Sequence, residues 1–338
     1  GKSVLFQLVN TNSCNKAAAI YDQHNVREIS HSRAGQANLN ETQNTILEAA
    51  QHAQNTQSKI LCVVTGVPGA GKTLAGLNSI SYLIKNLNLE EDQAAFLSGN
   101  NPLVKVLRKA LSQTLTRQIG NRVTIRSLES VIQEMHRFVQ DTYGFNTIPA
   151  HRAIVFDEAQ RAWSRKKNRE KFSRDISEPD MVLEIMGRHQ GWSLIIALVG
   201  GGQEIHSGEA GLSAWGEALV THPEWTVWTS PEALESGHAV AGSRLLDNAT
   251  RIETQRIIKR SELHLSIPTR SYEAENNASW VNAVLDGRES DALNYAGKML
   301  PVFITRNLND ARQWLASRIA PNRRSGLVAS SGAARLRA

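Results

Sequence analysis

Residues 66–73 read Gly-Val-Pro-Gly-Ala-Gly-Lys-Thr, and this stretch decides the fold of the chain. It follows the pattern G-x-x-x-x-G-K-[ST], which is typical of phosphate-binding loops. An apolar, β-branched run at 60–64 precedes it, and an apolar-periodic stretch with Leu74, Leu77 and Ile84 follows it. This order predicts a strand, a tight turn and a helix, which is the context that the pattern requires.

The chemistry of such a loop depends on its backbone. Glycines let main-chain N–H groups converge on a polyphosphate, and the helix N-terminus adds its positive dipole end. We expect Lys72 to reach the β- and γ-phosphates and the Thr73 hydroxyl to bind Mg²⁺. A glycine-rich turn that merely ends in Lys-Thr is the alternative, which the agreement of pattern and context disfavours. The predicted nucleotide-binding residues of the loop are Gly66, Pro68, Gly69, Ala70, Gly71, Lys72 and Thr73.

Composition indicates a globular protein. The chain has 338 residues, of which 41% are hydrophobic and 21% charged, so we expect one large domain or two ordinary ones. The net charge of +6 is compatible with a polyanionic partner, but many soluble enzymes are equally basic.

Cysteine usage and hydropathy favour the cytoplasm. Only Cys14 and Cys62 are present, and Cys62 falls in a predicted core strand, so a disulfide framework is not expected. No apolar run approaches the roughly 20 residues that cross a bilayer, and no signal or transit peptide is visible. Both ends fall beside strand-like runs, at 4–9 and 326–329. We therefore expect a fragment of a longer protein.

Apolar runs alternate with helical stretches along the chain. We expect helices at 41–54, after the 66–73 loop to about 86, from Pro102 onward and at 127–140. The predicted strands lie at 60–64, 94–97, 123–125, 153–156 and 194–199. Strands separated by helices predict a parallel sheet with helices on both faces. After about 260 the pattern restarts with a strand at 301–305, a helix at 310–319 and a strand at 326–330. The expected domains are a lead-in at 1–35, a first domain at 36–260 and an incomplete second one at 261–338.

A second chemical element lies at the end of the predicted strand 153–156. There the sequence reads Asp157-Glu158-Ala159-Gln160. We expect Asp157 to hold Mg²⁺ and Glu158 to accept the proton of the attacking water, as in metal-assisted phosphoryl transfer. The alternative is that the adjacent carboxylates are only a helix N-cap.

A third element follows the apolar run 194–199. It reads Gly200-Gly201-Gly202-Gln203, and a glutamine there can hydrogen-bond the γ-phosphate or the attacking water. The alternative is a glycine-rich loop with a solvated glutamine.

Together these residues resemble superfamily 1 helicase motors, and more closely the Schlafen-type DNA/RNA helicase domain. The resemblance covers residues 39–338 in the family's order, and it implies a fragment of a longer bacterial or phage-related protein. It implies an ATP-hydrolysing, RecA-like P-loop NTPase (a Walker A protein) with the start of a second RecA-like domain. The matching stretches are 39–43, 66–73, 96–100, 156–161, 200–211, 268–271 and 326–337.

The resemblance assigns further nucleotide contacts. Gln43 matches the glutamine that reads the adenine edge, although Asn40 with Gln43 also fits a capping box at a helix start. Arg270 in Pro-Thr-Arg-Ser matches the arginine that reaches the γ-phosphate across the cleft and stabilises transition-state charge. A surface or nucleic-acid-facing arginine is the alternative for Arg270.

Nucleic-acid contacts are expected at strand ends. Asn100 and Asn101 lie where such motors bind a nucleic-acid backbone. Asn101 as the N-cap, with Pro102 at the first helical position, is also an ordinary helix start. Thr124 and Ser127 hold a comparable position after the next strand. Between Arg161 and Arg174 seven of fourteen residues are basic, with Trp163 and Phe172 interleaved. This composition suits single-strand binding, but it equally suits a solvated loop or helix edge.

The leading hypothesis is an ATP- and Mg²⁺-dependent motor that acts on single-stranded DNA or RNA, with no membrane partner. The alternatives are an ATP-gated switch or anti-phage defence module, with a fused or associated effector domain, and a weakly catalytic scaffold. The usual Gly-Asp of the third motif is Gly-Gly-Gly here, which departs from most helicases but resembles the Schlafen-type group. The sequence predicts no oligomeric state, no polarity and no choice between DNA and RNA.

Overall fold

The computed structural model describes residues 33–119, 128–200, 209, 211–235, 243–247, 252–267, 272–297 and 305–317. The chain divides between Arg270 and Ser271 into two compact units. The lead-in expected at 1–35 lies outside the described residues up to position 32, and its last three residues begin a helix.

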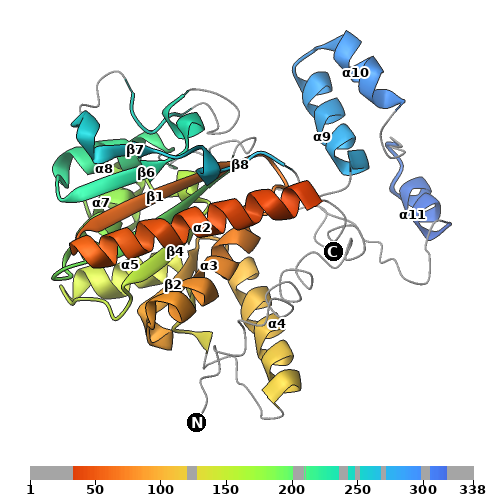
Figure 1. Ribbon diagram of the computed structural model, residues 1–338. Coiled ribbons are helices and arrows are strands. Elements are labelled where there is room, and N and C mark those ends of the chain that lie inside the picture. The colour runs from red at the N-terminus through yellow and green to blue at the C-terminus, as the bar shows by residue number, and fades with distance from the viewer. Residues whose placement is uncertain are drawn as a thin grey trace. The chain divides into compact units, whose positions relative to one another are not determined.

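The larger unit is built on one parallel sheet (Figure 1). Among the described residues its strands follow the order β3-β2-β4-β5-β1-β6-β7, and β8 pairs with the end of β1. Every strand pair is parallel, so the α/β class predicted from the sequence is confirmed. The strands are β1 (Lys59–Gly66), β2 (Ala94–Ser98), β3 (Ile132–Glu134), β4 (Ala153–Asp157), β5 (Ser193–Gly200), β6 (Trp225–Thr229), β7 (Ile257–Lys259) and β8 (His264–Leu265).

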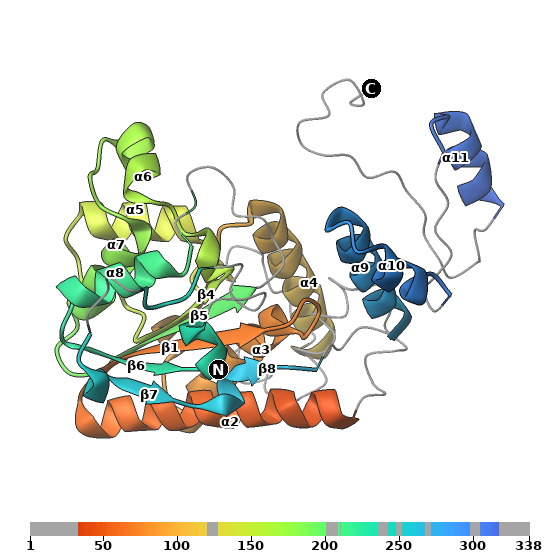
Figure 2. The same cartoon turned by 90° about the horizontal axis from the view of Figure 1, so that it is seen from above.

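Helices cover both faces of this sheet, which makes three layers. The helices α2 (Arg33–Thr56), α3 (Lys72–Leu87) and α4 (Asn101–Ile119) share one hydrophobic cluster with one face of the strands. The helices α5 (Met135–Gly144), α7 (Glu178–Gly187) and α8 (Ser213–Thr221) share a second cluster with the opposite face. Figure 2 shows α2 on one side of the strands and α5, α7 and α8 on the other.

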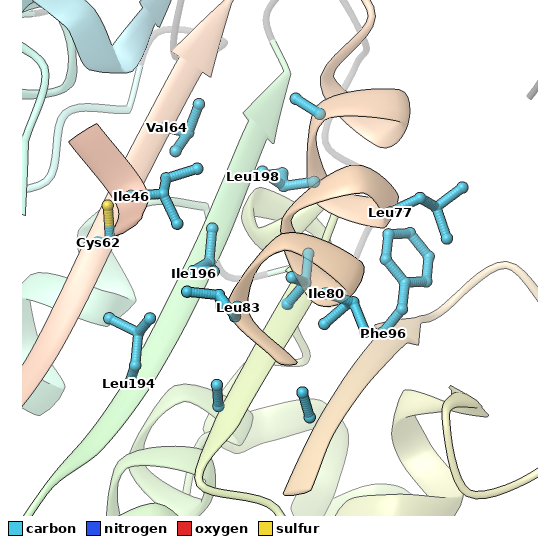
Figure 3. Packing of buried hydrophobic residues seen from close by; sticks show 14 of the residues in the cluster. Ile46, Cys62, Val64, Leu77, Ile80, Leu83, Phe96, Leu194, Ile196 and Leu198 are labelled. Atoms are coloured by element: carbon cyan, nitrogen blue, oxygen red, sulfur yellow. The ribbon is translucent and has the colours of Figure 1, made fainter. Parts of the chain in front are cut away.

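The central strands are buried on both faces. Cys62 and Val64 of β1 point into the first cluster, whereas Leu61 and Val63 point into the second. Figure 3 shows Cys62 and Val64 beside Leu194, Ile196 and Leu198 of β5, with α3 packed over them. Burial on both faces explains why the strands read as continuous apolar runs and not as alternating patterns.

One glycine sets how closely α3 approaches the sheet. A Cβ atom added at Gly76 would lie 2.6 Å from Leu198 Cδ1 and 2.8 Å from Val155 Cγ1. Helix α3 therefore packs on β4 and β5 at a separation that a larger residue would not allow. This packing places the N-terminus of α3 over the carboxyl ends of the strands.

Helix α2 is longer than the expected helix at 41–54. The Asn38 side chain donates to the His264 carbonyl (3.2 Å) and accepts from Ser266 N (3.0 Å), and Thr42 Oγ1 donates to the Glu262 carbonyl (2.6 Å). These tertiary contacts hold weak helix formers in the helix. The capping box at Asn40 and Gln43 is therefore wrong, because Asn40 lies inside α2 and accepts from Gln36 Nε2.

The helix expected at 127–140 is wrong in its first half. Residues 132–134 form β3, and α5 begins only at Met135. Ile132 pairs with Phe96 of β2, so pairing at the sheet edge overrides the helical pattern of the sequence. The strand expected at 123–125 lies outside the described residues.

The smaller unit contains α9 (Tyr272–Leu285), α10 (Glu289–Ala296) and α11 (Leu308–Ala316). Helices α9 and α10 pack against each other, and α11 overlaps the helix expected at 310–319. The strands expected at 301–305 and 326–330 lie outside the described residues, apart from Thr305, which is not in a strand. Among the helices described in either unit, none has both the length and the apolar character needed to cross a membrane.

Candidate nucleotide-binding site

The glycine-rich loop joins β1 to α3 at the carboxyl edge of the sheet. Gly69 (φ 79°) and Gly71 (φ 86°) adopt the left-handed conformation that favours glycine. Ala70 N donates to the Val67 carbonyl (3.1 Å), and Ala75 N donates to Gly71 O (2.8 Å) as the helix begins. The strand, turn and helix predicted around this octapeptide are all present.

Strand β8 supports the first residues of the loop. Val67 N donates to the Leu265 carbonyl (3.0 Å), and a Cβ atom at Gly66 would lie 2.8 Å from Leu265 Cβ. Only glycine allows this approach. The sequence does not predict β8, because a strand of two residues has no periodicity.

Lys72 lies across the loop. Its Nζ atom donates to the carbonyl oxygens of Gly66 (2.7 Å) and Val67 (3.1 Å). The ammonium group is therefore held at the inner side of the loop, where the backbone turns.

Thr73 meets Asp157 at the start of α3. The Thr73 hydroxyl donates to Asp157 Oδ1 (3.3 Å), and the Ser98 hydroxyl at the end of β2 approaches Oδ2 (3.5 Å). Asp157 is only 3% exposed. Burial and the neighbouring Glu158 raise the pKa of Asp157 to about 7, against the opposing effects of the Thr73 hydrogen bond and Lys72. Sequence reasoning missed Ser98, although a polar residue at a neighbouring strand end was a usable signal.

Glu158 follows in an unusual backbone conformation. Its φ of 54° and ψ of 48° are left-handed, a conformation that costs a non-glycine residue roughly 1–2 kcal/mol. Its carboxylate accepts from Gln160 Nε2 (2.5 Å), and Gln160 Oε1 in turn accepts from Gly200 N (3.1 Å). The glutamine thus fixes the carboxylate to the end of β5.

Gly200 shows that the predicted groups converge. A Cβ atom added there would lie 3.3 Å from Glu158 Oε2 and 3.4 Å from Lys72 Cε. The lysine of the loop, the carboxylate after β4 and the end of β5 therefore meet at one place. Residues far apart in the sequence form one constellation at the carboxyl edge of a parallel sheet, where such folds bind ligands.

The turn after β4 is braced by residues that sequence analysis did not select. Gln160 is almost fully buried, and its carbonyl accepts from Gly211 N (3.1 Å). Trp215 of α8 donates through Nε1 to the Ala159 carbonyl (2.9 Å) and meets Phe156 edge-on. These contacts hold the backbone that carries Glu158.

The remaining predicted residues divide into two groups. Gln43 lies in α2 and is half-buried. Asn100 caps α4, because its Oδ1 accepts from Leu103 N (3.3 Å), so the expected cap at Asn101 is wrong by one residue. Ser98 Oγ accepts from Asn100 N and turns the chain one residue earlier. Four predicted residues lie outside the described part of the chain: Thr124, Ser127, Gln203 and Arg270.

Residues 59–338 match the family model described as Schlafen group 3, DNA/RNA helicase domain. The chain belongs to this family. The match begins at the first residue of β1. Every predicted site residue of this Schlafen group 3 domain except Gln43 therefore lies within the matched part.

Solved structures give more distant likenesses. One is the Pyrococcus furiosus Hef helicase domain, with 13% identity and a TM-score of 0.30 over 56% of this chain and 43% of that one. Another is the Aeropyrum pernix ORC2 protein in ADPNP–ADP complexes, with 13% identity and a TM-score of 0.26 over 77% and 53%. The Schlafen group 3 chain thus spans about half the length of these structures. No curated protein matches it.

Proposed function

We propose that this domain hydrolyses ATP with Mg²⁺ and uses the cycle to act on single-stranded DNA or RNA. The observation that carries the proposal is the convergence of Lys72, the Thr73–Asp157 pair and Glu158 beside Gly200. A phosphate-binding loop, a metal-binding pair and a carboxylate base are the parts that phosphoryl transfer to water requires.

The residues at the start of α3 and the end of β4 fit a magnesium ion. Mg²⁺ prefers oxygen ligands and usually takes only one or two from the protein. The Thr73 hydroxyl and Asp157 carboxylate are such ligands, already within hydrogen-bond distance of each other. The buried Asp157 has a raised pKa, as expected of a carboxylate that a cation would stabilise. When bound, the ion would neutralise charge on the β- and γ-phosphates.

The protein's own residues would do the rest. The amides of 66–73 and the Lys72 ammonium hold the β- and γ-phosphates. Glu158 accepts the proton of the attacking water, and Gln160 keeps the Glu158 carboxylate oriented by its 2.5 Å hydrogen bond. Gln203 would sense the γ-phosphate, Arg270 would stabilise its transition-state charge, and Gln43 would read adenine.

The proposal extends to the organisation of the chain. Residues 36–260 would be the first RecA-like domain, and 261–338 the linker and the start of a second. Asn100, Asn101, Thr124 and Ser127 would contact the nucleic-acid backbone. Closing two lobes on ATP and releasing them after hydrolysis would move the protein along a strand.

Two substitutions test the hydrolytic part. Glu158→Gln should lower the rate of ATP hydrolysis by about 100-fold or more, because general-base catalysis is lost. Binding of a fluorescent ATP analogue should persist in this variant. Lys72→Ala should weaken that binding by about 1.5–3 kcal/mol, the value of a hydrogen bond to a charged group.

Matched controls come from the same elements of the fold. Lys85→Ala changes an exposed lysine at the far end of α3, and Glu217→Gln changes an exposed glutamate of α8. Both should behave like the wild type. Equal hydrolysis rates for wild type and Glu158→Gln would contradict the role of Glu158. ATP hydrolysis that single-stranded DNA and RNA do not stimulate would contradict the motor.

A further inference from the structure

A stack of rings lies just after the turn that carries Glu158. The rings of Trp163 and Phe172 are nearly parallel (19°), with centroids 5.8 Å apart. The His136 ring lies 4.0 Å from the Trp163 ring, and Lys167 Nζ lies 4.5 Å from the centre of that ring. We call these four residues the aromatic platform. Phe172, the last residue of α6 (Arg165–Phe172), is 41% exposed.

A buried carboxylate fixes the inner part of the platform. Glu178, at the start of α7, is fully buried. Its Oε1 accepts from His136 Nδ1 (2.5 Å), and its Oε2 accepts from Trp163 N (2.6 Å). Glu178 N donates in return to the Trp163 carbonyl (3.0 Å). Hydrogen bonds therefore fix the His136 ring and the backbone of Trp163, and Phe172 stacks on the Trp163 ring.

The helix beside the rings is strongly basic. Its sequence Arg-Lys-Lys-Asn-Arg-Glu-Lys-Phe carries five basic residues and one acidic residue, a net charge of +4 (5 − 1). Arg169 pairs with Asp175. Arg165, Lys166 and Lys171 are exposed and form no ion pair with any carboxylate that the structure describes. The charge is thus complementary to a polyanion.

The platform adjoins two parts of the proposed motor. Trp163 follows Glu158 by five residues (163 − 158), and Arg161 N donates to the Glu158 carbonyl (2.8 Å) within the connecting turn. On the other side, His136 Nε2 lies 3.9 Å from the position of a Cβ atom at Gly99, next to the Asn100 cap of α4. A nucleic-acid strand bound at the start of α4 would therefore lie next to the aromatic platform.

We propose that the aromatic platform binds single-stranded nucleic acid by stacking a base on Phe172, while Lys167 and the exposed cations of α6 contact the phosphates. This inference rests on the proposed function and names a binding site for its substrate. Rings beside cations are how single-strand binders hold bases without reading their sequence. Phe172 is 41% exposed, so part of its ring is accessible to a base.

The test compares base stacking with charge alone. The 338-residue chain is titrated with a short labelled oligodeoxythymidylate, with the matching oligouridylate, and with an abasic strand of the same length. The wild type should prefer the strands with bases. Phe172→Ala should weaken their binding by about fivefold or more, given the usual value of base–aromatic stacking. It should leave abasic binding unchanged, and Phe172→Tyr should restore the preference.

The control is Phe145→Ala, which removes a ring that is 78% exposed in the loop after α5. It should bind every strand as the wild type does. An unchanged preference for bases in Phe172→Ala overturns the platform but leaves ATP hydrolysis and the motor standing. Competition by polyglutamate as strong as that by the strands with bases also overturns it, because charge alone would then explain binding. If the wild type binds no strand, the nucleic-acid part of the proposed function falls as well.

Discussion

The turns that follow β1 and β4 lie at the same edge of the sheet, but their backbone conformations are stabilised in different ways. After β1 the chain turns through glycines, and Gly69 and Gly71 take left-handed conformations at little cost. After β4 a glutamate takes the left-handed conformation instead, and buried side chains hold it there. The first turn depends on backbone freedom, and the second depends on side-chain hydrogen bonds.

The difference predicts where function and stability are coupled. The 66–73 loop presents main-chain amides, so a substitution there should act on nucleotide binding mainly through backbone conformation. The turn after β4 is anchored to β5 and α8 through Gln160 and Trp215. A substitution there should reduce catalysis and folding stability together.

The largest expected effect, on folding stability and ATP hydrolysis together, comes from a substitution in the turn after β4. Gln160→Ala leaves the buried Gly200 N–H without its acceptor and releases the Glu158 carboxylate. We expect the free energy of unfolding to fall by about 1–3 kcal/mol, the cost of an unsatisfied buried donor. Chemical denaturation and ATP hydrolysis measure the two effects. Gln51→Ala, at an exposed position of α2, is the control, and a Gln160→Ala variant as stable as this control would refute the coupling.

An intermediate effect, on nucleotide affinity, is expected from a substitution in the loop after β1. Gly71→Ala places a Cβ atom on a residue with φ of 86°, at a cost of about 1–2 kcal/mol. Gly287→Ala is the matched control, because Gly287 also has a positive φ (70°) but nothing lies within 4 Å of its Cβ position. Both variants should lose similar stability in thermal unfolding. Only Gly71→Ala should lose affinity for a fluorescent ATP analogue, and equal affinities would show that the loop backbone is not the binding element.

A third effect concerns Asp157 and pH. Its pKa is about 7 in the folded protein against 3.8 for the ordinary residue. Between these values the unfolded chain releases the proton while the folded chain keeps it, so wild-type stability falls as pH rises through this window. Asp157→Asn removes that cost. Without nucleotide, it should raise Tm relative to wild type more at about pH 8 than at about pH 5. Asp92→Asn, at an exposed position, is the matched control. A change in Tm on Asp157→Asn that is the same at both pH values would show that burial does not govern Asp157.

Much of the fold could be predicted because the core strands are apolar runs. The strands β1, β2, β4 and β5 appear within a residue or two of their expected bounds. The glycine pattern predicted the turn between β1 and α3, because the conformation of such a turn depends on local sequence. The carboxylates after β4 were predicted from their place at a strand end, and their roles stay predictions.

The rest depends on contacts between distant residues. Ile132 forms a strand only because Phe96 lies beside it, and α2 extends to Arg33 through side chains that bond to 262–266. Gln160 follows the predicted carboxylates closely in the sequence, but its role depends on side-chain hydrogen bonds to Glu158 and to Gly200. No local pattern encodes such partners.

Strand β8 ties the loop at 66–73 to the end of the larger unit. Leu265 bonds to Val67 and lies five residues before the division at Arg270 (270 − 265), while Asn38 secures the adjoining backbone. A displacement of Leu265 would therefore reach Val67 through a single backbone hydrogen bond.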